Sequence, residues 1–188
     1  MPSSVLTVGY GKRSIEELIS LLKQENVEFL VDLRSKPVSR FNSAFSKEVL
    51  ADSIGKAGIR YVFMGDSLGG RPPDPTCYED GHVVYDLVRP KEFYRAGIKR
   101  LLDAASKGYR VCLLCSESKP EECHRSKLVG VSLVSSGIEV VHVGARGERM
   151  TQAEVLARLE SDQPTLFAES LRSRKAYKAA NAHSHIPD

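Results

Sequence analysis

The side chains best suited to chemistry in this sequence gather between residues 115 and 125. Two thiols, a carboxylate, an imidazole and a guanidinium occur there in the order Cys115-x-Glu117-(x)5-Cys123-His124-Arg125. A thiolate is a nucleophile, an imidazole is a common base for it, and an arginine binds phosphate or carboxylate oxygens through paired N–H groups. This stretch, termed the 115–125 segment, is therefore the first candidate for a site.

Thiol chemistry is one interpretation of the 115–125 segment. Cys115 at the end of a strand would be the nucleophile, His124 its base or acid, and Arg125 a clamp for an oxyanion or a phosphate. The sequence lacks the Cys-x5-Arg loop of thiol phosphatases, because Glu121 stands six residues after Cys115 and Arg125 stands ten residues after it. Ordinary phosphatase chemistry is therefore disfavoured.

Carboxylate chemistry is a second interpretation. Asp32 and Glu117 would be general acid and base, with Arg34 and Arg125 tuning them electrostatically. The structural alternative pairs Asp32 with one of these arginines and makes Cys115 a small buried hydrophobe. The sequence does not choose between thiol and carboxylate, so the predicted reactive set is Asp32, Cys115, Glu117 and His124.

A metal site is a third interpretation. Cys115, Cys123 and His124 could be three ligands of a tetrahedral zinc ion, with Asp32 or Glu117 as the fourth. This spacing matches no standard zinc signature, so neither a metal nor another cofactor is assigned.

A neighbouring thiol, in Cys112-x-x-Cys115, resembles part of a redox or metal motif. On a strand, however, residues three apart point to opposite faces of the sheet. Cys112 is therefore expected in the core.

The elements that must position these residues follow a repeated strand–helix pattern. Predicted strands alternate with predicted helices, and capping boxes begin at Ser14, Ser118 and Thr151. This alternation predicts a single-domain α/β fold: a mostly parallel five-stranded sheet with helices on both faces, a Rossmann-like three-layer arrangement. The strands are expected at 5–9, 28–33, 59–64, 110–115 and 139–143, and the helices at 14–25, 47–57, 91–107, 120–136 and 152–161.

Polar side chains follow the carboxyl ends of these strands, where ligands of parallel sheets bind. The start of the helix after the fourth strand offers free N–H groups to an anion. A long loop, 65–89, adds a Gly-Gly pair and is expected to bind or cover a ligand. The predicted phosphate- or ligand-binding residues are Tyr10, Lys12, Arg34, Ser39, Arg40, Gly69, Gly70 and Arg125, with His82 and His142 as weaker candidates.

Length and composition limit the class of protein. With 188 residues, 41% hydrophobic and 27% charged, the chain is long enough for one sizeable core. A net charge of +3 permits anionic ligands but lacks the basic excess of a dedicated DNA-coating protein. The sequence contains no apolar run of the roughly 20 residues that a membrane helix needs, and no secretory signal, so a cytoplasmic protein with reduced cysteines is expected.

Several of these motifs together resemble the domain of unknown function family 488. They are Thr7-Val8-Gly9-Tyr10, Asp32-Leu33-Arg34-(x)2-Pro37-x-Ser39, Leu68-Gly69-Gly70 and the 115–125 segment, and the resemblance spans about residues 5–167. Tyr10-Gly11 departs from the His-Ser pair of many members, which puts an essential role for Tyr10 in doubt. The resemblance implies an α/β fold and supports the position of the site, but it implies no settled activity.

The C-terminal part, residues 162–188, is polar and basic and is expected to be a flexible tail. Within it, Gln163-Pro164-Thr165-Leu166-Phe167 resembles the pentapeptide that binds bacterial sliding clamps, through Gln163, Leu166 and Phe167. The alternative, which we favour, is that Leu166 and Phe167 cover the chain's own apolar surface.

The sequence thus predicts an enzyme, or an enzyme-derived protein, that binds a nucleotide or nucleic acid during DNA repair or modification. Binding would use Lys12, Arg34, Arg40 and Arg125, so replacing Arg34 or Arg125 by alanine should weaken it without unfolding the domain. The alternative is a non-catalytic adaptor that binds a protein partner through its C-terminal tail.

Overall fold

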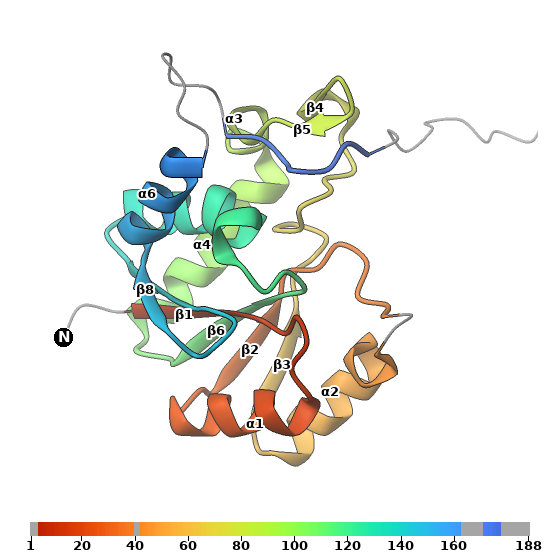
Figure 1. Ribbon diagram of the computed structural model, residues 1–188, viewed down its shortest axis with the longest axis vertical. Coiled ribbons are helices and arrows are strands. Elements are labelled where there is room, and N and C mark those ends of the chain that lie inside the picture. The colour runs from red at the N-terminus through yellow and green to blue at the C-terminus, as the bar shows by residue number, and fades with distance from the viewer. Residues whose placement is uncertain (1–3, 40–41, 163–170, 178–188) are drawn as a thin grey trace, which may run out of the picture.

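A six-stranded sheet forms the centre of the computed structural model, which describes residues 4–39, 42–162 and 171–177 (Figure 1). The strand order is β3-β2-β6-β1-β7-β8, and only β8 is antiparallel to its neighbour. The strands are β1 (Ser4–Gly9), β2 (Phe29–Asp32), β3 (Arg60–Phe63), β6 (Val111–Cys115), β7 (Glu139–Val143) and β8 (Arg149–Thr151).

The mostly parallel α/β fold is thereby confirmed, but the sheet has six strands where the sequence predicts five. The five predicted strands are the parallel ones, each a short segment rich in apolar residues. The additional strand, β8, has three residues and turns back beside β7. A strand this short shows no recognisable alternation of apolar and polar residues, which is why the sequence does not reveal it.

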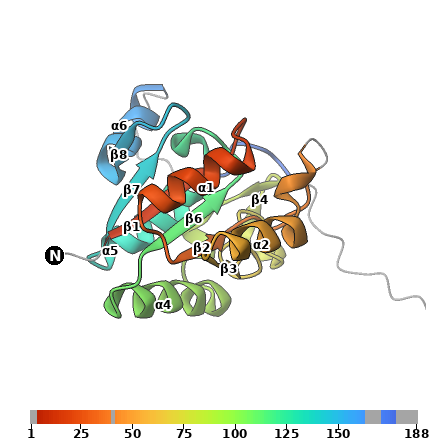
Figure 2. The same ribbon diagram turned by 90° about the horizontal axis from the view of Figure 1, so that it is seen from below.

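Helices cover both faces of the sheet (Figure 2). On one face lie α1 (Ile15–Gln24) and α2 (Lys47–Lys56), and their leucines and isoleucines pack against β1, β2 and β6. On the other face lie α4 (Glu92–Ser106) and α5 (Val131–Ser135). A sixth helix, α6 (Gln152–Asp162), contacts β7, and no helix in the described residues is long and apolar enough to cross a membrane.

The predicted helix 120–136 is interrupted. It consists of the 3-10 turn η3 (Pro120–Glu122), an extended residue at Cys123, the π-helix η4 (Arg125–Gly130) and then α5. The predicted capping box at Ser118 does not start it, since Lys119 occupies the N-cap and makes no side-chain cap bond. The capping box at Ser14, by contrast, is confirmed. Short π-helical segments inside helices often occur at functional sites.

The long loop 65–89 contains structure of its own. It holds η2 (Pro75–Cys77), a hairpin of β4 (Tyr78–Glu79) and β5 (His82–Val83), and α3 (Tyr85–Val88); a further 3-10 turn, η1 (Ser43–Phe45), precedes α2. Residues 171–177, termed the strap, run beside β5. The sequence predicts a flexible tail here, whereas these seven residues bind the hairpin through backbone hydrogen bonds. The pentapeptide 163–167 lies outside the described residues.

The order of the strands determines where a ligand can enter. The connections after β1 and β2 run through α1 and α2 on one face, whereas those after β3 and β6 run through α4 and α5 on the other. The end of β6 therefore lies between β2 and β1, whose connections run over the α1–α2 face of the sheet, whereas the connection after β6 runs over the opposite face. Such switch points open crevices in parallel sheets, and here one flanks each side of β6. This order differs from the 3-2-1-4-5 order of Rossmann sheets, because β6 is inserted between β1 and β2.

Candidate functional site

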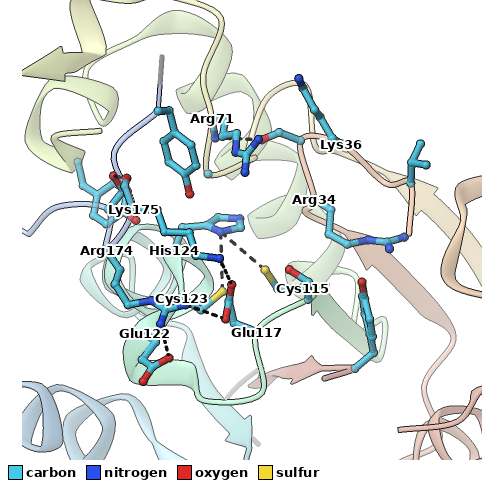
Figure 3. Close-up of a pocket in the computed structure, with 18 residues that line it drawn as sticks. Arg34, Lys36, Arg71, Cys115, Glu117, Glu122, Cys123, His124, Arg174 and Lys175 are labelled. Carbon is cyan, nitrogen blue, oxygen red and sulfur yellow. Dashed lines mark hydrogen bonds and ion pairs between the residues drawn. The ribbon is translucent and has the colours of Figure 1, made fainter. Parts of the chain in front are cut away.

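A pocket of about 340 Å³ opens at the carboxyl ends of β1, β2 and β6 (Figure 3). It combines the end of β6 with the 115–125 segment, the loops after β2 and β3, and the strap. Its lining residues are Tyr10, Arg34, Ser35, Lys36, Val38, Gly70, Arg71, Tyr85, Cys115, Ser116, Glu117, Glu122, Cys123, His124, Ser173, Arg174, Lys175 and Tyr177.

Two thiols and an imidazole meet in this pocket. His124 Nδ1 lies 3.8 Å from the Sγ of Cys115 and 3.8 Å from that of Cys123, and both thiols are buried. His124 Nε2 lies 3.2 Å from the carbonyl oxygen of Leu33. A carbonyl can only accept, so Nε2 carries the proton and the lone pair of Nδ1 faces the two thiols.

Gly70 shapes the space for the imidazole. A Cβ at this position would lie 2.8 Å from His124 Nδ1, which is closer than atoms can pack. One glycine of the Gly-Gly pair therefore has a structural role. Because Gly70 has no side chain, the 65–89 loop can pack directly against the His124 imidazole.

Arg125 supplies a buried positive charge beside the thiols. Its side chain is fully buried; Nη2 donates to the Ser118 carbonyl (3.1 Å), while Nε and Nη1 have no hydrogen-bond partner. Gly9 makes room for it, since a Cβ there would lie 2.8 Å from Nη1. A buried guanidinium that no carboxylate neutralises favours an anion nearby, and the neighbouring thiols can provide one.

The two thiols differ in acidity. A hydrogen bond from Cys123 holds the pKa of Cys115 well below its ordinary value, and His124 and Arg125 act in the same direction against burial. Burial, with the adjoining Cys115, raises the pKa of Cys123 well above its ordinary value. These opposite shifts favour loss of the first proton from Cys115 rather than from Cys123.

Cys112 lies on the opposite side of the sheet from Cys115, as the strand spacing predicts. It is fully buried against α1 and α2, and burial raises its pKa. It has no part in the pocket.

Asp32 and Arg34 form a closed ion pair. Arg34 donates from Nε and Nη2 to the Asp32 carboxylate (2.8 and 2.6 Å) and from Nη1 to the Phe45 carbonyl (2.7 Å). The Tyr61 hydroxyl donates to the same carboxylate (2.6 Å), and Asp32 is fully buried on the α1–α2 side of the sheet. The sequence predicts Asp32 as an acid or base and Arg34 as a phosphate ligand. In the structure the two side chains bind each other, which indicates a structural role for both.

Glu117 stands at the mouth of the pocket, held by the strap. Arg174 and Lys175 reach its two carboxylate oxygens at 3.2 and 3.8 Å, and Arg174 also pairs with Glu122 at 3.3 Å (Figure 3). Its side chain is one-third exposed, so these are pairs that a ligand can replace.

The other predicted ligand residues separate into two groups. Tyr10 lines the pocket, with its ring stacked on Phe45 at 4.1 Å, and Gly69 packs closely against the loop, where a Cβ would lie 2.2 Å from the Ser35 hydroxyl. Lys12 is exposed and Ser39 accepts from the Asn42 amide (3.1 Å), and neither lines the pocket. Arg40 lies outside the described residues.

The weaker histidine candidates have structural partners. His142 is fully buried between Thr7 Oγ1 and Gln152 Oε1, at 2.7 Å from each. His82 Nδ1 lies 2.9 Å from the Ser173 carbonyl and so helps to hold the strap. Neither lines the pocket.

Four exposed cations of the pocket are absent from the predicted site: Lys36, Arg71, Arg174 and Lys175. They lie in loops and in the strap. These segments have no periodic pattern of apolar residues from which the position of a side chain could be predicted. The sequence does offer one signal, because Arg71 directly follows the Gly69-Gly70 pair. The strap residues, by contrast, lie about fifty residues or more from the 115–125 segment, and nothing local places them there.

Among the described residues, one group could hold a metal ion: the ligand atoms of Cys115, Cys123 and His124, all within 4.8 Å of one another. The fourth ligand that the sequence proposes does not join them, since Asp32 is paired with Arg34 and Glu117 with the strap. Arg125 already places a positive charge beside the thiols, which opposes a second cation at this position.

A family model, that of the domain of unknown function DUF488, matches residues 14–132, more than half of the chain. The chain belongs to the DUF488 family. The match includes all of the 115–125 segment, so the thiol pair, His124 and Arg125 of this DUF488 protein lie within the family region, whereas the strap lies beyond it. Neither a curated protein nor a solved structure shows significant similarity to the chain.

Proposed function

We propose that this DUF488 protein is a cysteine-dependent enzyme whose nucleophile is the thiolate of Cys115, acting on an anionic, phosphate-bearing ligand. The observation that carries the proposal is the position of Cys115 at the base of a pocket, beside a second thiol and an unprotonated imidazole nitrogen, with the charge of the buried Arg125 guanidinium favouring its thiolate. A thiolate stabilised in this way is nucleophilic at neutral pH.

In this proposal His124 is the base and acid of the site and Arg125 stabilises charge on the sulfur. The Leu33 carbonyl fixes the imidazole so that Nδ1 can accept a proton from a thiol or return one to a leaving group. Arg125 does not bind the ligand directly, because it is fully buried beneath the pocket. Glu117, at the mouth, is the carboxylate of the predicted reactive set that could exchange protons with a ligand.

The charges around the pocket support an anionic ligand. Lys36, Arg71, Arg174 and Lys175 outnumber the two carboxylates, Glu117 and Glu122, and all four cations are exposed. A nucleotide or a short single strand of nucleic acid carries the matching charge. A role in DNA repair or modification would follow if single strands bind better than mononucleotides, and a thiol pair that works reduced suits the cytoplasm.

The nucleophile is tested by alkylation with iodoacetamide at graded pH, with each cysteine followed by peptide mass spectrometry. Cys115 should react well below pH 8.5, the ordinary pKa of a thiol, because its thiolate is stabilised. Cys77 and Cys112 of the same molecule are internal controls, since both are buried with raised pKa values. Reaction of Cys115 only together with these two, upon unfolding, would contradict the proposal.

The ligand class is tested by titrating inorganic phosphate, a mononucleotide and a single-stranded oligonucleotide against charge-neutralised variants. Arg71→Gln and Lys36→Gln should each weaken binding by about tenfold, the typical loss of one charge-assisted hydrogen bond. Lys12→Gln is the matched control, because Lys12 follows β1 at the same edge of the sheet but lies outside the pocket. Equal losses in all three variants would indicate non-specific attraction.

The adaptor alternative has less support, because its peptide, 163–167, lies outside the described residues. It predicts a partner that deletion of this peptide removes while Cys115 keeps its reactivity.

A further inference from the structure

Cys123 is the second thiol of the pocket, and a mechanism with one nucleophile uses it only as a hydrogen-bond donor to Cys115. It comes from the turn after η3, whereas Cys115 ends β6, and both are nearly fully buried yet line the pocket. Both are free thiols, and their Sγ atoms and His124 Nδ1 all lie within 4.8 Å of one another. Two sulfurs at this separation can form a disulfide after a small movement of the turn.

The surroundings of the two thiols are asymmetric. The Cys123 sulfur accepts the backbone N–H of Arg125 at 3.5 Å, and the Arg125 guanidinium, with two unpartnered nitrogens, provides a positive charge within the same turn. His124 Nδ1 is equidistant from both sulfurs, so one proton acceptor serves the pair. Cys123 is thereby held in the turn, whereas Cys115 at the strand end accepts a hydrogen bond from it, so the two can act as resolving thiol and nucleophile.

We propose that Cys123 is a resolving cysteine and that the pocket catalyses thiol–disulfide exchange with small acidic thiols and disulfides. The proposal rests on the proposed function, since Cys115 remains the nucleophile. It keeps an anionic substrate but makes it a sulfur compound, whose carboxylate or phosphate groups would bind the cations Lys36, Arg71 and Arg174 at the entrance.

The exchange balances as follows. The Cys115 thiolate attacks one sulfur of a substrate disulfide and forms a mixed disulfide as the S–S bond of the substrate breaks. The other half leaves as a thiolate and takes up a proton from water. Cys123 gives its proton to His124 Nδ1, and its sulfur then attacks Cys115 Sγ. The second half of the substrate leaves as a thiolate and is protonated by His124. The substrate disulfide gains two electrons, the pair becomes a Cys115–Cys123 disulfide, and an external thiol compound reverses the sequence.

The arrangement favours this chemistry over a metal site. Two thiolates and an imidazole would hold a soft dication, but among the described residues no fourth side chain joins this group, and Arg125 adds a positive charge beside it. A dithiol that keeps one proton places a single negative charge next to that guanidinium and so balances it.

The experiment treats the full-length reduced protein with a large excess of oxidised glutathione, as the probe disulfide, and maps all disulfides by mass spectrometry. The wild type should yield the Cys115–Cys123 disulfide and release two glutathione molecules for each protein. Cys123→Ser should stop at a stable mixed disulfide on Cys115 and release one. Cys115→Ser should form no disulfide and release no glutathione. Cys77→Ser is the matched control and should behave as the wild type. Circular dichroism establishes that each variant folds, and Cys123→Ala provides a second variant at the resolving position.

The outcomes separate the two proposals. A wild-type mixed disulfide on Cys115 that Cys123 never resolves would overturn the exchange mechanism and leave the nucleophile intact. No modification of Cys115 would overturn both. Stoichiometric metal that remains on the purified protein and blocks both thiols would also overturn both, in favour of a metal site.

Discussion

Gly70 and His124 illustrate how much the chemistry of this pocket depends on single residues. The imidazole lies beside both thiols because its neighbour in the 65–89 loop has no side chain. The sequence assigns Gly70 and His124 to one candidate site, and both line the pocket, but it does not predict their contact, since more than fifty residues separate them. Only the fold brings the loop onto the ring.

Gly70→Ala should displace His124 from the thiols, because the added Cβ would lie 2.8 Å from Nδ1. We expect alkylation of Cys115 at neutral pH to slow by about tenfold, since a displaced base commonly costs this much or more. Stability should change little at a half-buried loop position. Gly55→Ala in α2 is the control, since a Cβ there would meet nothing within 4 Å, and alanine should stabilise the helix by roughly 0.5–1 kcal/mol. An unchanged Cys115 rate in Gly70→Ala would show that the ring position does not matter.

At the scale of elements, the strap is a part of the pocket wall that lies outside the family region. It adds a third extended segment to the β4–β5 hairpin: the Ser173 amide donates to the Val83 carbonyl, and the Ser173 hydroxyl accepts from the Val83 amide, both at 2.9 Å. Tyr177 stacks under the Arg71 guanidinium at 4.2 Å. These contacts hold Arg174 and Lys175 over Glu117 (Figure 3).

Truncation after residue 170 should therefore open the pocket and raise the alkylation rate of Cys115 several-fold, measured at neutral pH with circular dichroism as a folding check. Truncation after Tyr177 keeps the strap and should leave the rate unchanged. The double variant Arg174→Glu, Lys175→Glu should also raise the rate, because it replaces attraction to Glu117 by repulsion while keeping the backbone bonds of the strap. Equal rates in both truncations would show that the strap does not cover Cys115.

The elements that the sequence predicts correctly are those with a strong local signal. The five parallel strands are short segments rich in apolar residues, and α1 begins at the predicted capping box. The helix expected over 120–136 has equally good local signals, but the chain there is extended at Cys123, which places this thiol beside Cys115. In the 115–125 segment, which contains the candidate reactive residues, tertiary packing therefore overrides the local preference for a helix. The strap has no local pattern at all and depends on contacts distant in the sequence.

At the scale of the whole molecule, the insertion of β6 between β1 and β2 gives the site its position. The end of β6 lies near the middle of the sheet, so Cys115 is covered on all sides except the pocket. A second buried polar group lies nearby, on β7. There the Thr7 hydroxyl donates to His142 Nδ1, which leaves Nε2 to donate to Gln152, and the Gln152 amide donates to the Ser126 carbonyl (3.2 Å).

This buried histidine should make the fold sensitive to acid. Burial lowers the pKa of His142 from 6.5 to about 4. Because the unfolded chain binds the proton first, the stabilisation is present above pH 6.5 and is lost as the pH falls to 4. The loss is about 3 kcal/mol. Urea unfolding at pH 7, 5.5 and 4 should show it, and His142→Gln, although less stable, should show a shallower decline. Parallel profiles would contradict this assignment.

The buried positive charge of Arg125 should also affect the redox potential of the Cys115–Cys123 pair. When the two sulfurs form a disulfide, the thiolate beside the Arg125 guanidinium is lost and an unpaired cation remains in the interior. The free-energy cost of this buried charge destabilises the oxidised form. The midpoint potential of the pair should then be more positive than that of an uncharged dithiol, as for other dithiols whose reduced form is stabilised. Arg125→Met should shift the midpoint to more negative values in a glutathione redox titration, and an unmoved midpoint would show that the cation has no such effect. In a reducing compartment, such a pair stays reduced at rest and passes an acquired disulfide onward rather than storing it.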